Sequence, residues 1–147
     1  MLDIKKIVVP VDLNKNTQKL VDYALTIAKP FDAEVALFHA VEFMTMGEMA
    51  LGNPNYDDMN TTHKNNAQKT LSEIVTIAST KCRKCTSEVV IGDIVDEILA
   101  YTKREDGNMI IIGTHGKRGF ERILLGSVAE RVLKNAHCPV LVMNPYK

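Results

Sequence analysis

The sequence has no net charge, few cysteines and no long apolar run. Its 147 residues include 18 Lys and Arg against 18 Asp and Glu, so the formal net charge is zero. A dedicated nucleic-acid-binding protein needs an excess of cations that displace counterions, and a polybasic membrane anchor needs clustered cations. The charge balance therefore argues against both kinds of partner.

No apolar stretch approaches the roughly 20 residues that span a bilayer, and the first residues, Met1 to Lys6, contain no apolar signal-peptide region. Three cysteines are too few for a disulfide framework and cannot all pair. We therefore expect a reduced, cytoplasmic protein with no membrane partner. The length favours one domain over residues 1–147, large enough to bury a core without a disulfide or metal staple.

Five short apolar runs, rich in β-branched residues, alternate with longer segments of helical period. The runs lie at residues 7–9, 35–38, 89–91, 109–112 and 140–143. They are continuous and do not alternate with polar residues, which is typical of strands covered by helices on both faces.

The segments between these runs predict four helices. One apolar stripe at a period of 3.6 runs from Leu20 to Phe31, a second begins at Ala67, and two further helices open at Asp93 and Ser127. This alternation indicates an α/β fold with one five-stranded parallel sheet, right-handed crossovers and helices on both faces.

The connection from Phe43 to about Thr62 has no clear period and is rich in methionine. Connections this long are commonly functional or disordered. One interpretation is a surface excursion; the other is a lid or a partner surface, because methionine packs adaptably.

The glycines indicate the strand order and the place of a ligand site. In open α/β sheets, ligands bind beyond the carboxyl ends of the strands, where the strand order reverses. An order of 2-1-3-4-5 would place the site after the third strand, at Gly92-Asp93, whereas 3-2-1-4-5 places it between the first and fourth strands. Because residues 113–126 contain four of the eight glycines, we expect the order 3-2-1-4-5.

The glycine segment predicts an anion site. Without a Cβ, glycine lets a ligand approach the backbone closely, so that successive N–H groups can cradle an anion. The positive dipole end of the helix at Ser127 and the cations Lys117 and Arg118 add to this. The segment is not a Walker loop, because Arg118 follows Gly116-Lys117. It is not a dinucleotide fingerprint either, because the first strand ends at Asp12 with no glycine.

The same segment resembles the ATP-binding members of the universal stress protein family, which have the pattern G-x2-G-x9-G-[S/T] after the fourth strand. Here Gly113, Gly116 and Gly126-Ser127 match that spacing without a gap. The run Val128-Ala129-Glu130 and the opening strand that ends at Asp12 are also similar to the family. The resemblance implies a Rossmann-like fold of the adenine nucleotide alpha-hydrolase type.

The resemblance also implies a set of nucleotide-binding residues. Asp12 would lie at the adenine edge, Val41 would pack on the base, and the glycine segment would bind the ribose and phosphates. The implied residues are Pro10, Val11, Asp12, Val41, Ile112, Gly113, Gly116, Gly126, Ser127 and Val128. The chain departs from the family after the aspartate, where Leu13-Asn14 replaces a frequent small residue and serine.

A function follows from the resemblance as an expectation. The chain would bind ATP, or else AMP or ADP, together with Mg²⁺, and act as a regulator in a stress response. No general base or water-positioning residue is evident, so we expect little or no hydrolysis and no catalytic or metal-binding side chains. The alternatives are a nucleotide-free protein-interaction module and a slow ATPase.

The resemblance further implies a homodimer through the last strand, Val140 to Met143, besides an unidentified protein partner. The order 3-2-1-4-5 agrees, because it leaves this apolar strand at an edge of the sheet, where an unpaired strand tends to associate.

Other motifs have plainer interpretations. Ser127-x-x-Glu130 reads as a capping box that starts a helix, and His39 as a hydrogen-bonded core residue. His115 lies inside the glycine segment, where it could contact phosphate.

Cys82 and Cys85 form a lone C-x2-C, which we interpret as a surface thiol pair in a basic, solvated turn. A zinc site would need two more ligands at suitable spacing. A thioredoxin-like motif would open the first helix of its fold, whereas this pair precedes the third strand.

Overall fold

The computed structural model describes residues 1–42, 56–114 and 125–145. Its strands are β1 (Lys6–Pro10), β2 (Glu34–Val41), β3 (Cys85–Ile91), β4 (Met109–Gly113) and β5 (Val140–Met143). Its helices are α1 (Thr17–Ala28), α3 (Tyr56–Ala78), α4 (Ile94–Arg104) and α5 (Ser127–Asn135), with a short 3-10 helix η1 (Lys29–Phe31) after α1.

The five strands form one parallel sheet in the order β3-β2-β1-β4-β5, so the predicted order 3-2-1-4-5 is confirmed. The central strand β1 pairs with β2 on one side and β4 on the other, with Val8 opposite Ala36 and Ile110. Consecutive strands therefore lead outward from β1 to β3, after which the chain returns to the other side of β1 for β4 and β5. The reversal lies between β1 and β4, and in open α/β sheets ligands bind beyond the carboxyl ends of the strands at such a point.

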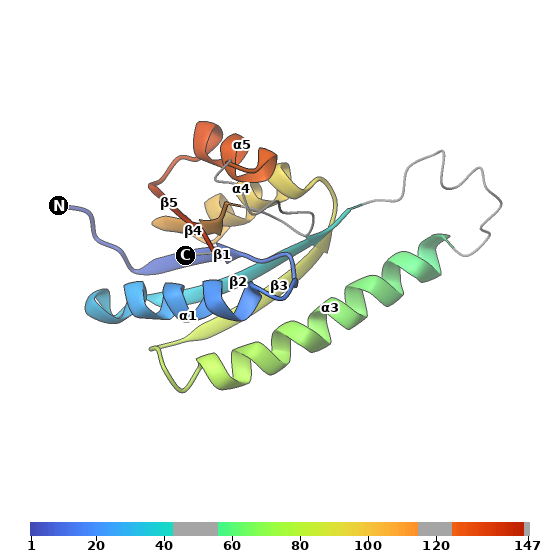
Figure 1. Ribbon diagram of the computed structural model, residues 1–147, viewed down its shortest axis with the longest axis horizontal. Coiled ribbons are helices and arrows are strands. Elements are labelled where there is room, and N and C mark those ends of the chain that lie inside the picture. The colour runs from blue at the N-terminus through green and yellow to red at the C-terminus, as the bar shows by residue number, and fades with distance from the viewer. Residues whose placement is uncertain (43–55, 115–124, 146–147) are drawn as a thin grey trace.

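Helices cover both faces of the sheet, as Figure 1 shows. Ile7 and Val9 of β1 pack into the layer formed with α1 and α3, whereas Val8 packs into the layer formed with α4 and α5. Side chains alternate in direction along a strand, so a strand buried on both faces needs the continuous apolar run that the sequence has. In the second layer, Phe38 stacks on Tyr101 with ring centroids 4.5 Å apart.

Two helix boundaries differ from the sequence prediction. Helix α3 begins at Tyr56, so part of the connection expected to continue to about Thr62 is helical. Asn60 in this stretch is only 5% exposed, which shows that tertiary packing supports a segment without an apolar period. Residues 43–55, where the proposed lid or partner surface would lie, are outside the described residues.

The first apolar stripe also ends earlier than predicted. Helix α1 ends at Ala28, and Pro30 and the left-handed Asp32, at φ 49°, follow in and after η1. The α-helix therefore ends before Phe31, which does not continue the buried stripe of α1 and is 47% exposed.

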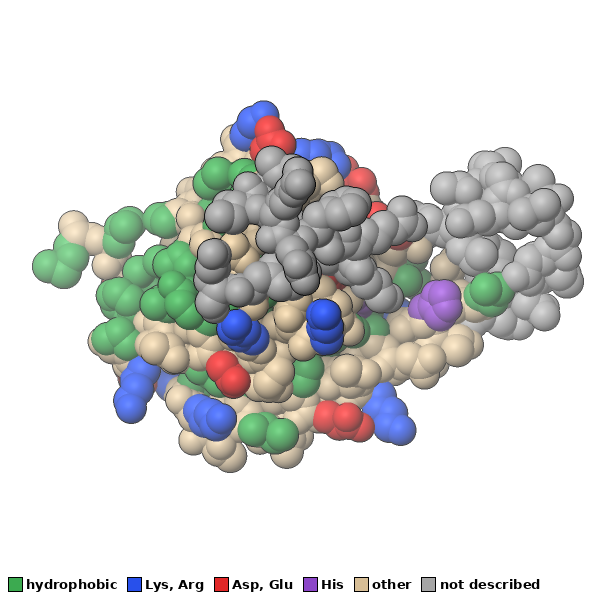
Figure 2. Space-filling model, in the orientation of Figure 1, with side chains coloured by type: hydrophobic (Ala, Val, Ile, Leu, Met, Phe, Trp, Pro, Cys, Tyr) green, Lys and Arg blue, Asp and Glu red, His purple; other side chains and the backbone are tan. Residues whose placement is uncertain are grey.

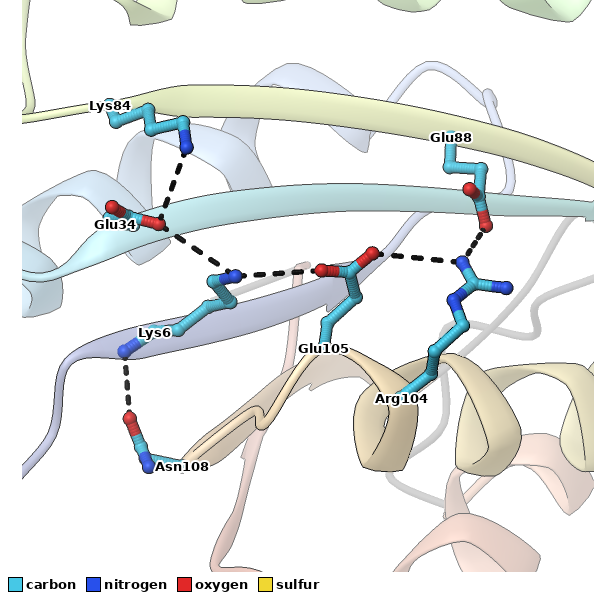
Figure 3. A network of polar contacts seen from close by, with 7 residues as sticks. All are labelled: Lys6, Glu34, Lys84, Glu88, Arg104, Glu105 and Asn108. Carbon is cyan, nitrogen blue, oxygen red and sulfur yellow. Dashed lines mark hydrogen bonds and ion pairs between the residues drawn. The ribbon is translucent and has the colours of Figure 1, made fainter.

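A network of charges connects the amino ends of β1 and β2 to the end of α4 and to β3 (Figure 3). Lys6 lies 3.8 Å from Glu34 and 3.6 Å from Glu105, and Arg104 pairs with Glu105 and Glu88. These side chains alternate in sign, and their exposures range from 25% for Lys6 and Glu34 to 57% for Arg104. An ion pair that water can reach contributes about 1 kcal/mol or less. We therefore interpret the network as support for this edge of the sheet and assign it no ligand.

Figure 2 shows Lys and Arg side chains interspersed with Asp and Glu on the face it presents, in agreement with the zero net charge. Among the described residues, none of the helices has the length and apolar composition required for a membrane span.

Candidate functional site

Hydrogen bonds hold the carboxyl ends of β1 and β2 together. Beyond the end of β1, the Val11 N–H donates to the Phe38 carbonyl at 2.8 Å. His39 Nδ1 lies 2.7 Å from the Val11 carbonyl oxygen, so the predicted hydrogen bond is present. His39 is half-buried, however, and is not the core residue that we predicted. These contacts fix the backbone immediately before Asp12.

The loop after β1 is a compact chain of side-chain turns. The Asp12 carboxylate accepts from the Asn14 backbone N–H at 3.2 Å and from the Asn14 side-chain amide at 2.9 Å. Asn14 Oδ1 in turn accepts from the Asn16 N–H at 2.8 Å. Leu13 between them has a φ of 60°, a left-handed conformation that the surrounding hydrogen bonds have to support. Asn14 thus orients the aspartate and the entry to α1.

Backbone hydrogen bonds join the end of β4 to β5 and to the start of α5. The Thr114 N–H donates to the Met143 carbonyl at 2.9 Å, and the Gly126 N–H donates to the Thr114 carbonyl at 2.6 Å. Gly113 and Gly126 are therefore brought together at one end of the sheet, although twelve residues separate them in the sequence. Gly116 and His115 lie outside the described residues.

Helix α5 begins at Ser127, as predicted, but the predicted capping box is wrong. Its N-cap is Gly126, with an extended backbone at φ −63° and ψ 155°, and no side chain of the described residues caps it. Ser127 follows the N-cap position by one residue, so its side chain does not cap the helix. Glu130 does not reach back to the N-cap either, and forms an ion pair with Lys134 at 2.8 Å. Because the first turn of a helix has N–H groups without intrahelical partners, this helix start is suited to an anion.

Apolar side chains from both layers flank these backbone groups. Val11 is 6% exposed and belongs to the layer of α1 and α3, against which the half-buried Val41 also packs. Ile112 is 4% exposed and, like the half-buried Val128, belongs to the layer of α4 and α5. The nucleotide-binding residues that the resemblance implies, so far as the structure describes them, thus lie along the carboxyl ends of the strands. Apolar side chains flank β1, β2 and β4 there, and the start of α5 provides free backbone N–H groups.

Sequence reasoning missed two polar groups near this edge. Thr17, the first residue of α1, and Asn60 in α3 are 6% and 5% exposed. Thr17 Oγ1 and Asn60 Oδ1 have no hydrogen-bond partner in the described structure. No pattern in the sequence marks them, because threonine and asparagine are ordinary at exposed positions of a helix, and only the packing reveals that they are buried.

The described residues include no group of three or more His, Cys, Asp or Glu side chains suited to a metal ion. Cys82 and Cys85 do not form the surface pair that we predicted, because Cys85 is buried at 8% exposure. It is the first residue of β3, where alternation points it into the core.

A family model described as the universal stress protein family matches residues 3–144. The chain belongs to the universal stress protein family. Universal stress protein MJ0531 of Methanocaldococcus jannaschii is 39% identical over 144 residues, which cover 97% of this chain and 84% of that protein.

Solved structures of the family share the fold. Universal stress protein UspA from Lactobacillus plantarum superposes with a TM-score of 0.84 at 22% identity, covering 95% of this chain and 97% of that one. The universal stress protein from Archaeoglobus fulgidus in complex with dAMP superposes with a TM-score of 0.64 at 18% identity, covering 97% and 98% of the two chains. The described topology and the family membership agree with a Rossmann-like α/β fold.

Proposed function

We propose that this universal stress protein binds an adenine nucleotide, ATP or else AMP or ADP, at the carboxyl ends of β1 and β4. The observation that supports this most directly is the start of α5, where Gly126 is the N-cap and no described side chain caps the helix. Such a helix start can donate backbone N–H groups to phosphate. The spacing of Gly113, Gly116 and Gly126-Ser127 supports the same assignment.

The base and the phosphates would occupy different parts of the crevice. Val11, Val41 and Ile112 provide apolar surface for adenine, and Asp12 provides a carboxylate that could accept from its amino group. The dAMP complex of the Archaeoglobus fulgidus protein is consistent with an adenine nucleotide in this fold. Mg²⁺ would be bound chiefly by the phosphates and water, in keeping with its preference for oxygen ligands.

We propose a regulatory role in a stress response with little or no hydrolysis. Asp12, the carboxylate of the described crevice, is bound to Asn14 on both oxygens, which leaves it poorly placed as a general base. Bound nucleotide would instead change the surface that a protein partner meets. The place of action we propose is the cytoplasm.

We also propose that the protein forms a homodimer through β5. This strand lies at the edge of the sheet, and its residues Val140 to Met143 are all half-buried. Leu133 of the neighbouring α5 is 47% exposed. An apolar edge strand of this kind is stabilised by pairing with a second copy. Light scattering should give the mass of a dimer at micromolar concentration, and a monomer would contradict the proposal.

Calorimetric titration tests nucleotide binding. Wild type should bind Mg-ATP, whereas Gly126→Val should lose about tenfold or more in affinity, because the new side chain crowds the proposed phosphate site. Asp93→Ala is the matched control, because it alters the start of α4, a helix to which we assign no ligand. Equal heats from wild type and Gly126→Val would refute the proposed site.

A phosphate-release assay tests the absence of catalysis. Wild type and Gly126→Val should release phosphate from ATP at the same low background rate. Release by wild type well above that of the variant would favour the slow ATPase instead.

A further inference from the structure

Cys82 lies in the turn between α3 and β3, and Cys85 is the first residue of β3. Both are at the amino end of the strand, whereas the proposed nucleotide site is at the carboxyl ends. Cys82 is half-buried and Cys85 is 8% exposed. The Cys82 thiol donates to the Ala78 carbonyl at 3.5 Å. Each thiol also contributes to the pKa shift of the other, which indicates that the two sulfur atoms lie near each other. In a thioredoxin-like protein the C-x2-C pair opens the first helix of the fold, whereas this pair stands at the start of a strand. The chemistry of the pair therefore has to be inferred from the surroundings of the two sulfur atoms.

The contacts distinguish the two thiols. Burial raises the pKa of Cys82, and hydrogen bonds to the Lys84 backbone and the Cys85 thiol oppose that rise. Burial raises the pKa of Cys85 to about 12, and the charge of Cys82 and the hydrogen bond between the thiols add to the rise. Cys82 is the less buried of the two thiols and the one that lines a cavity, so a ligand reaches it first, and its thiolate would be the nucleophile.

An open cavity of about 310 Å³ adjoins Cys82, between the end of α1 and the turn after α3. Its charged lining residues are Lys29, Lys81, Arg83 and Asp32. Three cations against one carboxylate favour an anionic ligand. The accessible thiol thus opens onto a basic hollow, while its partner thiol lies in the core.

We propose that Cys82 and Cys85 form a thiol–disulfide exchange site, and that the cavity accepts an anionic low-molecular-weight disulfide. The Cys82 thiolate attacks one sulfur of the ligand, the ligand S–S bond breaks, and the departing thiolate takes up the proton that Cys82 lost. Cys85 then loses its proton and attacks the Cys82 sulfur, which releases the second ligand thiol. The two protein thiols are oxidised to one disulfide, and the ligand disulfide is reduced to two thiols.

The test uses the full reduced chain and oxidised glutathione, a peptide disulfide with several carboxylates. Free thiols are trapped by alkylation at each time point and the intact mass is measured. Wild type should lose two hydrogen atoms and leave Cys138 as its alkylated thiol. Cys85→Ser should stop at a mixed disulfide on Cys82, and Cys82→Ser should form neither product.

A charge series tests the cavity. Oxidised glutathione should react faster than cystamine, a cationic disulfide, and Arg83→Gln should lower that rate ratio by about threefold at low ionic strength. Arg131→Gln, an exposed position on α5, should leave the ratio unchanged.

Three results would overturn the proposal. The first is a stable mixed disulfide on the wild-type chain, since Cys85 would then not resolve it. The second is a reaction at Cys138 as fast as that at Cys82. The third is a rate ratio that Arg83→Gln leaves unchanged. None of these depends on nucleotide binding, so the two proposals fail independently.

Discussion

The two helices of one layer begin in different ways, and the difference provides a matched pair of variants. At α4, Asp93 Oδ1 accepts from the Asp96 N–H at 3.0 Å. At α5, Ser127 is already inside the helix and its side chain forms no cap bond. Asp93→Ala should therefore lower the free energy of unfolding, whereas Ser127→Ala should leave it almost unchanged.

The size of the difference follows from the structure. Both side chains are exposed, so neither substitution opens a cavity. The loss of the N-cap hydrogen bond is therefore the main contribution to the change in the free energy of unfolding. Removing an N-cap aspartate costs about 1 kcal/mol, within a range of roughly 0.5–2 kcal/mol. In a chain of this size, about 1 kcal/mol corresponds to a fall in Tm of about 2–4 °C. Urea denaturation of the nucleotide-free proteins, with thermal unfolding as a second measurement, gives the comparison.

Adding nucleotide should narrow the difference in stability between the two variants. A ligand that binds only the folded state at one hundred times its Kd stabilises it by about 2.7 kcal/mol. Ser127→Ala should reduce this gain if the hydroxyl contacts phosphate, while Asp93→Ala should retain all of it. If Ser127→Ala destabilises the nucleotide-free protein as much as Asp93→Ala does, the hydroxyl caps α5 after all, and the reasoning about its first turn is refuted.

Three further predictions concern the core and the thiols. Phe38→Ala, which removes the ring stacked on Tyr101, should cost about 3–5 kcal/mol in urea denaturation. Gly107→Ala should cost about 1–3 kcal/mol in the same assay, because a Cβ there would lie 2.8 Å from Thr102 Cγ2. Since burial raises the pKa of Cys82, its rate of disulfide exchange should keep rising beyond about pH 8.5, where an ordinary thiol is half ionised, and a plateau at lower pH in stopped-flow measurements would contradict this.

The topology could be predicted because several independent patterns agree. Continuous apolar runs require cover on both faces, their alternation with helices requires parallel crossovers, and the glycines after the fourth run mark the point of reversal. The candidate site followed from the same step, since residues at the carboxyl ends of neighbouring strands must lie close together. Pro10, Asp12, Gly113 and Ser127 were placed at one edge for that reason.

Helix starts were less predictable, because a side chain caps only when the backbone has the right conformation at its own position. Ser127-x-x-Glu130 matches the capping pattern, but Gly126 takes the capping position and shifts the serine by one residue. At Asp93, by contrast, the extended backbone at φ −72° and ψ 127° presents the carboxylate to the helix, and the prediction is confirmed.

The sequence by itself determined the strand order and the family, because periodicity and glycine spacing are local properties of the chain. Only the tertiary structure decided that Asn14 binds Asp12, that Asn60 is buried, and that one thiol of the C-x2-C pair faces a basic cavity while the other enters the core. These depend on which segments, distant in the chain, pack against one another, and neighbouring residues in a sequence carry little information about that.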